Sequence, residues 1–158
     1  MIIKEGFDKI KTCGNYNPIL NRSILVSCFL NDDLSKSLWE YNFYSQEDKL
    51  TYTFIVDNDE VILKDTGSLM NLKQTPEELK INNLKLNDKE IIAVTKFFIV
   101  KKYNEERLSK IIISIENSNT IIWNVTVVLN NLNIINLKIN DTNSEVIQDN
   151  KVSPFNFV

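Results

Sequence analysis

The residues with the most suggestive chemistry are Asp65-Thr66-Gly67-Ser68, which directly follow the apolar run Val61-Ile62-Leu63. An aspartate at the junction of a strand and a loop can share one proton with a second aspartate. Such a pair activates a water molecule for hydrolysis. Because the chain holds one copy of this string, two chains would have to associate to form the pair. One hypothesis is therefore a homodimeric hydrolase that uses Asp65, Thr66 and Gly67.

Three features of the sequence speak against that aspartic-protease-like hypothesis. Lys64 precedes Asp65, where aspartic proteases have an apolar residue. Those enzymes also need a later motif of two apolar residues and a glycine, but no glycine follows Gly67. At the matching place in the second half of the chain, Asp149-Asn150-Lys151 lacks the glycine as well. We favour a strand end closed by an Asx turn, with Gly67 at positive φ.

The remaining polar clusters indicate turns and solvated ends rather than sites. The chain contains no histidine, the commonest general acid–base and metal ligand. Asp57, Asp59 and Glu60 lack the central glycine of a calcium-binding loop, so we predict a tight hairpin turn there. Glu105-Glu106-Arg107 is predicted to be a solvated helix exit. The sequence thus predicts no catalytic residue, no cofactor and no metal ligand, and it identifies no binding residue.

The two cysteines, Cys13 and Cys28, continue the apolar faces of a predicted helix and a predicted strand. Cys28 shares its face with Ile24, Val26 and Leu30 by alternation. We predict that both are buried free thiols. A disulfide between them is the alternative, favoured only in an oxidising compartment.

Composition limits the partners and the location of the protein. The 158 residues carry a net charge of −3 and show no basic stripe, which argues against a nucleic-acid partner. No apolar run approaches the roughly 18 residues of a membrane span, so we predict no membrane partner. The N-terminus reaches Lys4 and Glu5 too early for a signal peptide. We expect a cytoplasmic protein, with an exported form that has lost its leader as the alternative.

Trp39, Tyr41 and Phe43 alternate along one predicted strand and could form either a recognition surface or part of the core. Aliphatic residues follow Trp123 at the matching positions of the second half, which favours the core. Tyr44 and Tyr52 are then the aromatic residues predicted to be exposed.

Two similar strings of elements are predicted, with Trp39 and Trp123 separated by 84 positions. The first comprises a helix over 3–13 and strands over 22–30, 37–45, 50–56 and 60–64. A bridging segment follows, with a short helix that opens at Thr75-Pro76-Glu77-Glu78. The second comprises a helix from the capping box at Asn87 to about Tyr103, and strands over 109–116, 120–129, 132–140 and 144–149. This spacing predicts one supersecondary unit used twice.

Several stretches are similar to proteins with tandem PepSY-like units. They are Leu86 to Ile92, Trp123 to Val127, Asn136 to Asn140, Asn140 to Val146 and Trp39 to Ser45. The glycine that this family has before the glutamate is Ser144 here. The resemblance implies two cystatin-like units, each a helix packed on an antiparallel sheet of about four strands. It also implies a binding or protease-modulating role.

We therefore expect an α+β protein with a first unit over 1–68, a bridge over 69–86 and a second unit over 87–158. The expected function is non-catalytic binding of an unidentified protein or peptide, to which a free sheet edge could add an extended peptide as a strand. The alternatives are the homodimeric enzyme at Asp65 and a structural or assembly protein. The oligomeric state stays open.

Overall fold

The computed structural model describes residues 2–32, 37–68, 76–118 and 120–153. Its helices are α1 (Ile3–Thr12), α2 (Asn17–Leu20) and α3 (Asp88–Tyr103), with 3₁₀ turns at Gly14–Tyr16 and Ile81–Asn83. The first four strands are β1 (Ile24–Asp32), β2 (Ser37–Ser45), β3 (Leu50–Asp57) and β4 (Glu60–Ser68). The second four are β5 (Leu108–Ser118), β6 (Thr120–Leu129), β7 (Ile134–Asn140) and β8 (Val146–Val152).

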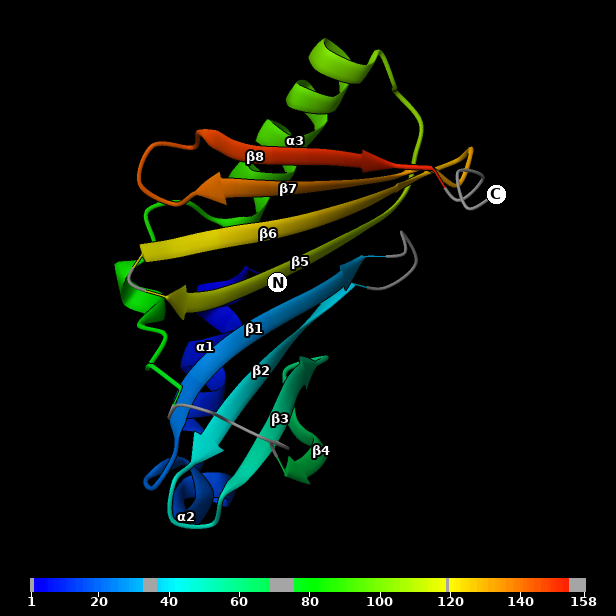
Figure 1. Ribbon diagram of the computed structural model, residues 1–158. Coiled ribbons are helices and arrows are strands. Elements are labelled where there is room, and N and C mark those ends of the chain that lie inside the picture. Colours follow the sequence, from blue (N-terminus) through cyan, green and yellow to red (C-terminus); the bar gives the residue numbers. More distant parts are fainter. Residues whose placement is uncertain (1, 33–36, 69–75, 119, 154–158) are drawn as a thin grey trace.

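All eight strands belong to one antiparallel sheet, in the order β4-β3-β2-β1-β5-β6-β7-β8 (Figure 1). The expectation of two repeated units, each a helix on its own sheet of about four strands, is therefore wrong. The reason is that β1 pairs directly with β5, from Ser27 opposite Glu116 to Asp32 opposite Ile111. We call β1–β4 the N-terminal half-sheet and β5–β8 the C-terminal half-sheet. Only β4 and β8 have an unpaired edge among the strands that the structure describes.

A β-bulge in β1 changes which of its side chains face the core. The register with β2 shifts between Leu25 and Ser27. Leu25 is consequently buried along with Cys28 and Leu30. The predicted inward positions Ile24 and Val26 are only half-buried, because an extra residue in one strand shifts the side-chain alternation.

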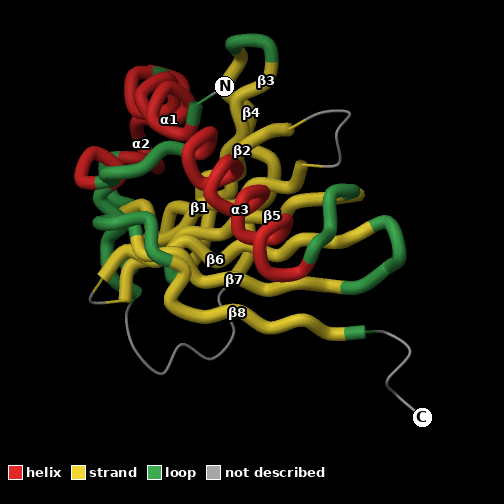
Figure 2. The backbone as a smooth tube through the Cα atoms, turned by 90° about the horizontal axis from the view of Figure 1, so that it is seen from above, coloured by secondary structure: helices red, strands yellow, loops and turns green. Residues whose placement is uncertain are grey.

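The long helices α1 and α3 lie on the same side of the sheet (Figure 2). The core forms between them and the sheet, and it contains Trp39, Tyr41 and Phe43 of β2 as predicted. Trp123 of β6 is also fully buried. The two indole rings meet edge to face, with ring centroids 6.4 Å apart. Both tryptophans are thus core residues, and they touch each other across the junction of the two half-sheets.

The bridging segment does not contain the predicted helix over the residues that the structure describes. Residues 76–80 are irregular, and Thr75 lies outside the described residues. Leu79 and Ile81 are both buried, a spacing of two that a helix would not place on one face. The backbone N–H of Leu79 also donates to the carbonyl of Leu25, 2.7 Å away. The contacts of this segment with β1 therefore determine its conformation, and the helix predicted from the capping pattern does not form there.

The hairpin turn predicted from Asp57, Asp59 and Glu60 is confirmed. Asp57 pairs with Glu60 at the ends of β3 and β4, which leaves two residues in the turn. Those residues, Asn58 and Asp59, both have positive φ, 46° and 68°. Asn and Asp adopt this left-handed conformation more readily than most residues, and it matches the twist of a two-residue hairpin.

Candidate binding groove

The α3 helix is defined at both ends by local polar contacts. At its start, the Asn87 side chain accepts from the backbone N–H of Glu90, 3.0 Å away, and Glu90 accepts from the backbone N–H of Asn87, 2.8 Å away. At its end, Asn104 has a φ of 53° and donates its backbone N–H to the carbonyl of Val100. The predicted capping box is confirmed, and the left-handed Asn104 turns the chain back toward β5.

The segment before α3 is held by the buried carboxylate of Asp141, which follows β7. This carboxylate accepts from the backbone N–H of Lys85, 2.8 Å away, and from that of Leu86, 3.2 Å away. It also accepts from the indole N–H of Trp123, 2.9 Å away. Three donors on one carboxylate fix the entry of α3 against β6 and β7.

The C-terminal end of α3 is held by Asp149 of the edge strand β8. The Lys102 ammonium lies 2.7 Å from one Asp149 oxygen and 2.8 Å from the other, and the Tyr103 hydroxyl donates to the same carboxylate. The hydrogen bond from Lys102 lowers the pKa of Asp149, and Tyr103 adds to this effect. Burial, together with Asp149, raises the pKa of Tyr103 to about 12. The helix is therefore tied to the β8 side of the sheet.

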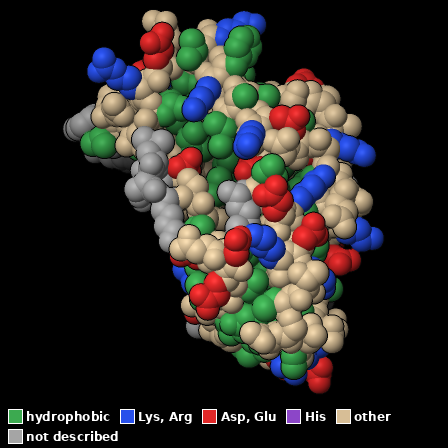
Figure 3. Space-filling view, turned by 180° about the vertical axis from the view of Figure 1, so that it is seen from behind, with side chains coloured by type: hydrophobic (Ala, Val, Ile, Leu, Met, Phe, Trp, Pro, Cys, Tyr) green, Lys and Arg blue, Asp and Glu red, His purple; other side chains and the backbone are tan. Residues whose placement is uncertain are grey.

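On its other flank, α3 leaves a groove of about 340 Å³ against the start of β5 and the end of β1. Figure 3 views the face that carries the helices, and hydrophobic side chains lie between charged ones over its upper part, where α3 runs. The apolar lining consists of Ile92, Val100, Leu108 and Ile111. The charged lining consists of Asp32, Lys96, Glu105, Glu106 and Lys110. This arrangement, the α3–β5 groove, has apolar side chains for an apolar ligand group and charges of both signs to orient it.

Exposure within the groove is concentrated on α3. Val100 has 44% of its surface exposed, and Ile92 and Leu108 are half-buried. Glu105 is oriented by the Lys151 ammonium at 3.4 Å and by the Asn131 side-chain amide at 3.4 Å. The apolar surface of Val100 is thus open to a ligand, beside a carboxylate whose position is already fixed.

Comparisons with known proteins show the fold but not a family. No protein family and no curated protein matches the chain. One solved structure, described as a putative lipoprotein from Clostridium difficile 630, is similar with a TM-score of 0.64 at 14% sequence identity. The match covers 92% of this chain and 91% of that one. At this identity the likeness concerns the fold alone. Within the described residues, no helix is long and apolar enough to cross a membrane.

The Asp65-Thr66-Gly67 string lies inside the edge strand β4, not at a junction with a loop. Asp65 is exposed and opposite Thr53, and its carboxylate accepts from the backbone N–H of Thr66, 2.8 Å away. The predicted positive φ of Gly67 is wrong, because Gly67 is ordinary extended strand backbone. The structure places these residues on the far side of the sheet order from β8 and away from the α3–β5 groove.

The other sequence candidates also lie outside the groove, with one exception. Cys28 is buried, Cys13 is half-buried, and both are free thiols; burial raises the pKa of Cys28. Asp59 forms an ion pair with Lys9 of α1, and no metal-ligating cluster is found in the described part of the chain. The exception is Glu105-Glu106, predicted to be a solvated exit, since both residues line the groove.

The prediction that Tyr44 and Tyr52 are exposed is wrong. Both are buried, with 9% and 7% of their surface exposed. The hydroxyl of Tyr52 donates to Asp48, 2.9 Å away, which also pairs with Arg22 at 3.1 Å. Alternation along β3 in fact places Tyr52 on the same buried face as Phe54 and Val56, and the loop after β2 accepts its hydrogen bond.

The exposed apolar residues of α3 were missed by sequence reasoning. The core-facing side of α3 contains the buried Ile91 and Thr95. Phe97 and Val100, however, have 68% and 44% of their surface exposed. The sequence does indicate this exposure, because apolar residues occur on all sides of the helix rather than on one face. Since Thr95 faces the sheet, Phe97, two positions later, must point away from it.

Proposed function

We propose that this protein is a non-catalytic binding module that holds a protein or peptide segment in the α3–β5 groove. The observation that carries the proposal is the exposed apolar surface of Val100 beside the half-buried Ile92 and Leu108. An apolar side chain of a partner would be removed from water there.

The shape and charge of the groove support a peptide more than a small metabolite. Its volume of about 340 Å³ is near the lower end for ligand pockets, yet it is open along the flank of α3. Lys96 and Lys110 offer donors, and Glu105 and Glu106 offer acceptors, to the main chain or the charged ends of a segment. The absence of histidine from the chain also favours binding over acid–base catalysis.

The test is selection of peptides from a random displayed library on the purified protein, followed by affinity measurement with fluorescently labelled peptides. We expect enriched sequences with a recurrent apolar anchor. Val100→Asp should weaken their binding about tenfold or more, because it places a charge on the apolar lining. The matched control is Leu132→Asp in the turn between β6 and β7, another apolar residue with much of its surface exposed (60%). No enrichment, or equal losses in the two variants, would contradict the proposal.

A protease-modulating role is a narrower form of the same proposal and rests on the PepSY resemblance. Adding the protein to a peptidase assay, with Val100→Asp as the control, tests it directly. Inhibition or activation that survives Val100→Asp would show that the α3–β5 groove is not responsible.

A second candidate function is assembly through a sheet edge. It is favoured by the exposed Ile147 on the unpaired strand β8. Size-exclusion chromatography with light scattering separates the two candidates. A stable oligomer that Ile147→Lys converts to monomers supports assembly, and a monomer at all concentrations argues against it.

A further inference from the structure

We infer that the outward face of α3 rests on an anionic lipid surface. This face is formed by Ala93, Phe97 and Val100, with Lys96 and Lys101 beside them, and we call it the α3 outer face. The inference goes beyond the proposed function, because Phe97 and Lys101 do not line the α3–β5 groove, whereas Val100 and Lys96 border both surfaces. The sequence predicted no membrane partner from the lack of a span, but a peripheral contact needs none.

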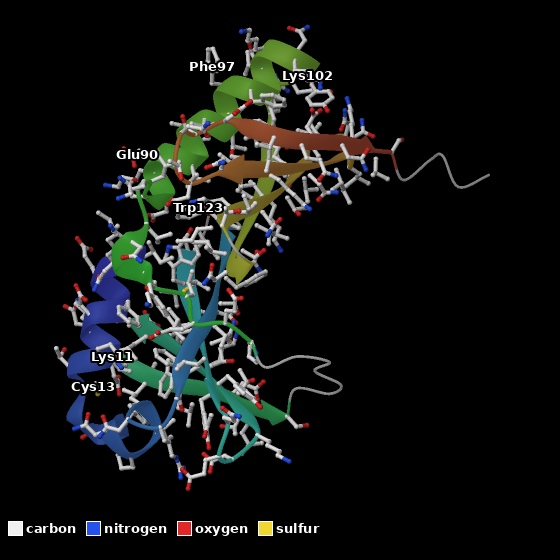
Figure 4. All side chains as sticks on the ribbon, turned by 60° about the vertical axis from the view of Figure 1, so that its left-hand side comes forward. Lys11, Cys13, Glu90, Phe97, Lys102 and Trp123 are labelled. Atoms are coloured by element: carbon white, nitrogen blue, oxygen red, sulfur yellow. The ribbon has the colours of Figure 1, made fainter. Side chains whose placement is uncertain are left out.

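The first argument is the geometry of the apolar residues. Ala93, Phe97 and Val100 follow one another at spacings of four and three, so they share one side of the helix. All three are exposed, and Phe97 has 68% of its surface exposed. In Figure 4 Phe97 points away from the sheet, while Lys102 lies at the end of the helix nearest β8. Figures 1 and 4 both show the last turns of α3 extending past β8, so this face stands out from the body.

The second argument is charge complementarity. The protein has a net charge of −3, yet the stretch from Ile91 to Tyr103 contains three lysines and no acidic residue. Lys102 is paired with Asp149, but neither Lys96 nor Lys101 has an ion-pair partner among the described residues. The nearest acidic residue before this stretch, Glu90, is engaged in the capping box. The charged side chains of the α3 outer face itself are therefore lysines, which suit anionic headgroups, and the acidic Glu105 and Glu106 lie in the adjoining groove.

The third argument is the relation between ring and ammonium. The Lys101 ammonium lies over the Phe97 ring, 5.8 Å from its centroid. A ring that enters the boundary between headgroups and acyl chains needs its flanking lysines to reach back to the phosphates, and the long lysine stem allows this. Phe97 and Lys101 already present such a pair on one side of the helix.

The size of the α3 outer face favours a lipid surface over a protein. Three apolar residues, one of them an alanine, form a small patch, whereas a stable protein interface buries about 800 Å² on each partner. A bilayer imposes no such area and accepts a single inserted ring with nearby cations. We expect weak, reversible binding that orients the molecule rather than anchoring it.

The experiment is co-sedimentation of the full chain with vesicles of phosphatidylcholine containing roughly one third phosphatidylglycerol, and with vesicles of phosphatidylcholine alone. We expect binding to the anionic vesicles only, decreasing with added salt. Phe97→Ala should lower the partition coefficient about tenfold or more, because the largest apolar group is lost. Lys96→Glu together with Lys101→Glu should lower it by a similar factor.

Matched controls lie on exposed positions away from α3. Leu132→Ala removes an exposed apolar side chain in the turn between β6 and β7, and Lys138→Glu reverses an exposed charge on β7. Neither should change the partition coefficient. Equal losses in these controls would overturn the inference, as would equal binding to both kinds of vesicle or binding to neither.

Phe97→Trp gives a direct readout of insertion. Trp39 and Trp123 are buried, so a new indole at position 97 alone should be quenched by brominated acyl chains. Unquenched fluorescence in the presence of bound vesicles would show that another surface makes the contact. If Phe97→Ala instead abolishes a dimer seen by light scattering, without any vesicle binding, the α3 outer face is a protein interface and the lipid inference is wrong.

Discussion

The two half-sheets carry their long helices in different ways. Against the N-terminal half-sheet, α1 packs through aromatic rings: Phe7 stacks on Phe43 with centroids 6.3 Å apart. Tyr16 meets Phe54 edge to face at 5.0 Å. The hydroxyl of Tyr41 donates to the backbone carbonyl of Ile3, 2.8 Å away. A ring contact and a buried hydrogen bond thus hold the first half of α1, and Tyr16 holds the 3₁₀ turn that follows the helix.

The C-terminal half-sheet offers α3 a largely aliphatic surface. Its buried side chains include Ile113, Ile115, Val125, Val127, Ile135 and Leu137. Here α3 is fixed by polar contacts near its ends, at Asp141 and Asp149, rather than by rings in its middle. The two long helices are thus held in different ways, by ring contacts in the N-terminal half-sheet and by polar contacts near the helix ends in the C-terminal half-sheet. Aromatic side chains contact α1, whereas α3 borders the α3–β5 groove and exposes Phe97 and Val100.

The largest effect should come from the carboxylate that fixes the entry of α3. Asp141→Ala leaves three donors without their acceptor, among them the buried indole N–H of Trp123, and we expect a loss of about 3–5 kcal/mol in the free energy of unfolding. Asp88→Ala is the matched change, because Trp39 donates to Asp88 over a longer 3.4 Å and the other Asp88 oxygen is unsatisfied within the described residues. It should cost only about 1–2 kcal/mol. Urea denaturation measures both losses, and a larger loss for Asp88→Ala than for Asp141→Ala would contradict this prediction.

The aromatic attachment of α1 can be tested through one hydroxyl. Tyr41→Phe keeps the ring and removes the hydrogen bond to Ile3, so we expect a loss of about 1 kcal/mol. Tyr103→Phe on α3 is the control, and it should cost less because its partner Asp149 keeps the bonds from Lys102. If Tyr41→Phe leaves the free energy of unfolding unchanged in thermal or urea denaturation, ring packing alone holds α1.

A substitution in the turn between β6 and β7 should stabilise the protein. Leu132, between β6 and β7, has a φ of 65° and 60% of its surface exposed. Asparagine tolerates this left-handed conformation better than leucine, so Leu132→Asn should raise the free energy of unfolding by about 0.5–1 kcal/mol. Ile147→Asn on the extended strand β8 is the control, and no gain is expected there. A lower melting temperature for Leu132→Asn would contradict this account.

The smallest effect concerns the pH dependence of stability. Each long helix forms one lysine–aspartate ion pair, Lys9 with Asp59 for α1 and Lys102 with Asp149 for α3. In both Asp149 and Asp59, a hydrogen bond from lysine lowers the pKa. A lowered carboxyl pKa stabilises the fold above the unfolded value of about 3.9, and this stabilisation is lost as the pH falls through the folded value. Asp149→Asn should therefore flatten the loss of stability below about pH 5. Asp59→Asn should hardly change it, because the Asp59 side chain is 81% exposed against 18% for Asp149. Equal effects in urea titrations at acidic pH would contradict this order.

Much of the local structure was predictable from the sequence. All eight strands lie close to their predicted positions, because alternation and turn residues such as Asn58 act within a few positions of the chain. The capping box at Asn87 also located the start of α3. The pairing of β1 with β5 was not predictable, since it joins distant segments and no local pattern specifies a partner strand. The bulge near Val26 likewise depends on pairing with β2.

The candidate site was harder to predict than the fold. The sequence predicts a charged helix exit at Glu105 and Glu106, but their place beside Val100 depends on how the chain returns from α3 to β5. The string most similar to a reactive motif surrounds Asp65, which lies on β4 and outside the groove. Binding surfaces made of exposed apolar residues carry no motif, so only the fold shows that Phe97 and Val100 stay uncovered.

The pairing of β1 with β5 has a consequence for how the protein acquires its structure. Within each half-sheet, neighbouring strands are joined by short turns and can pair soon after they are made. The partners of the central ladder, such as Cys28 and Ile115, lie roughly 80 to 90 positions apart, so closing it demands a much larger loss of chain entropy. We expect this ladder to form late, and its closure to set the folding rate. Until it closes, β1 and β5 remain unpaired edges on which a second, partly folded chain could assemble.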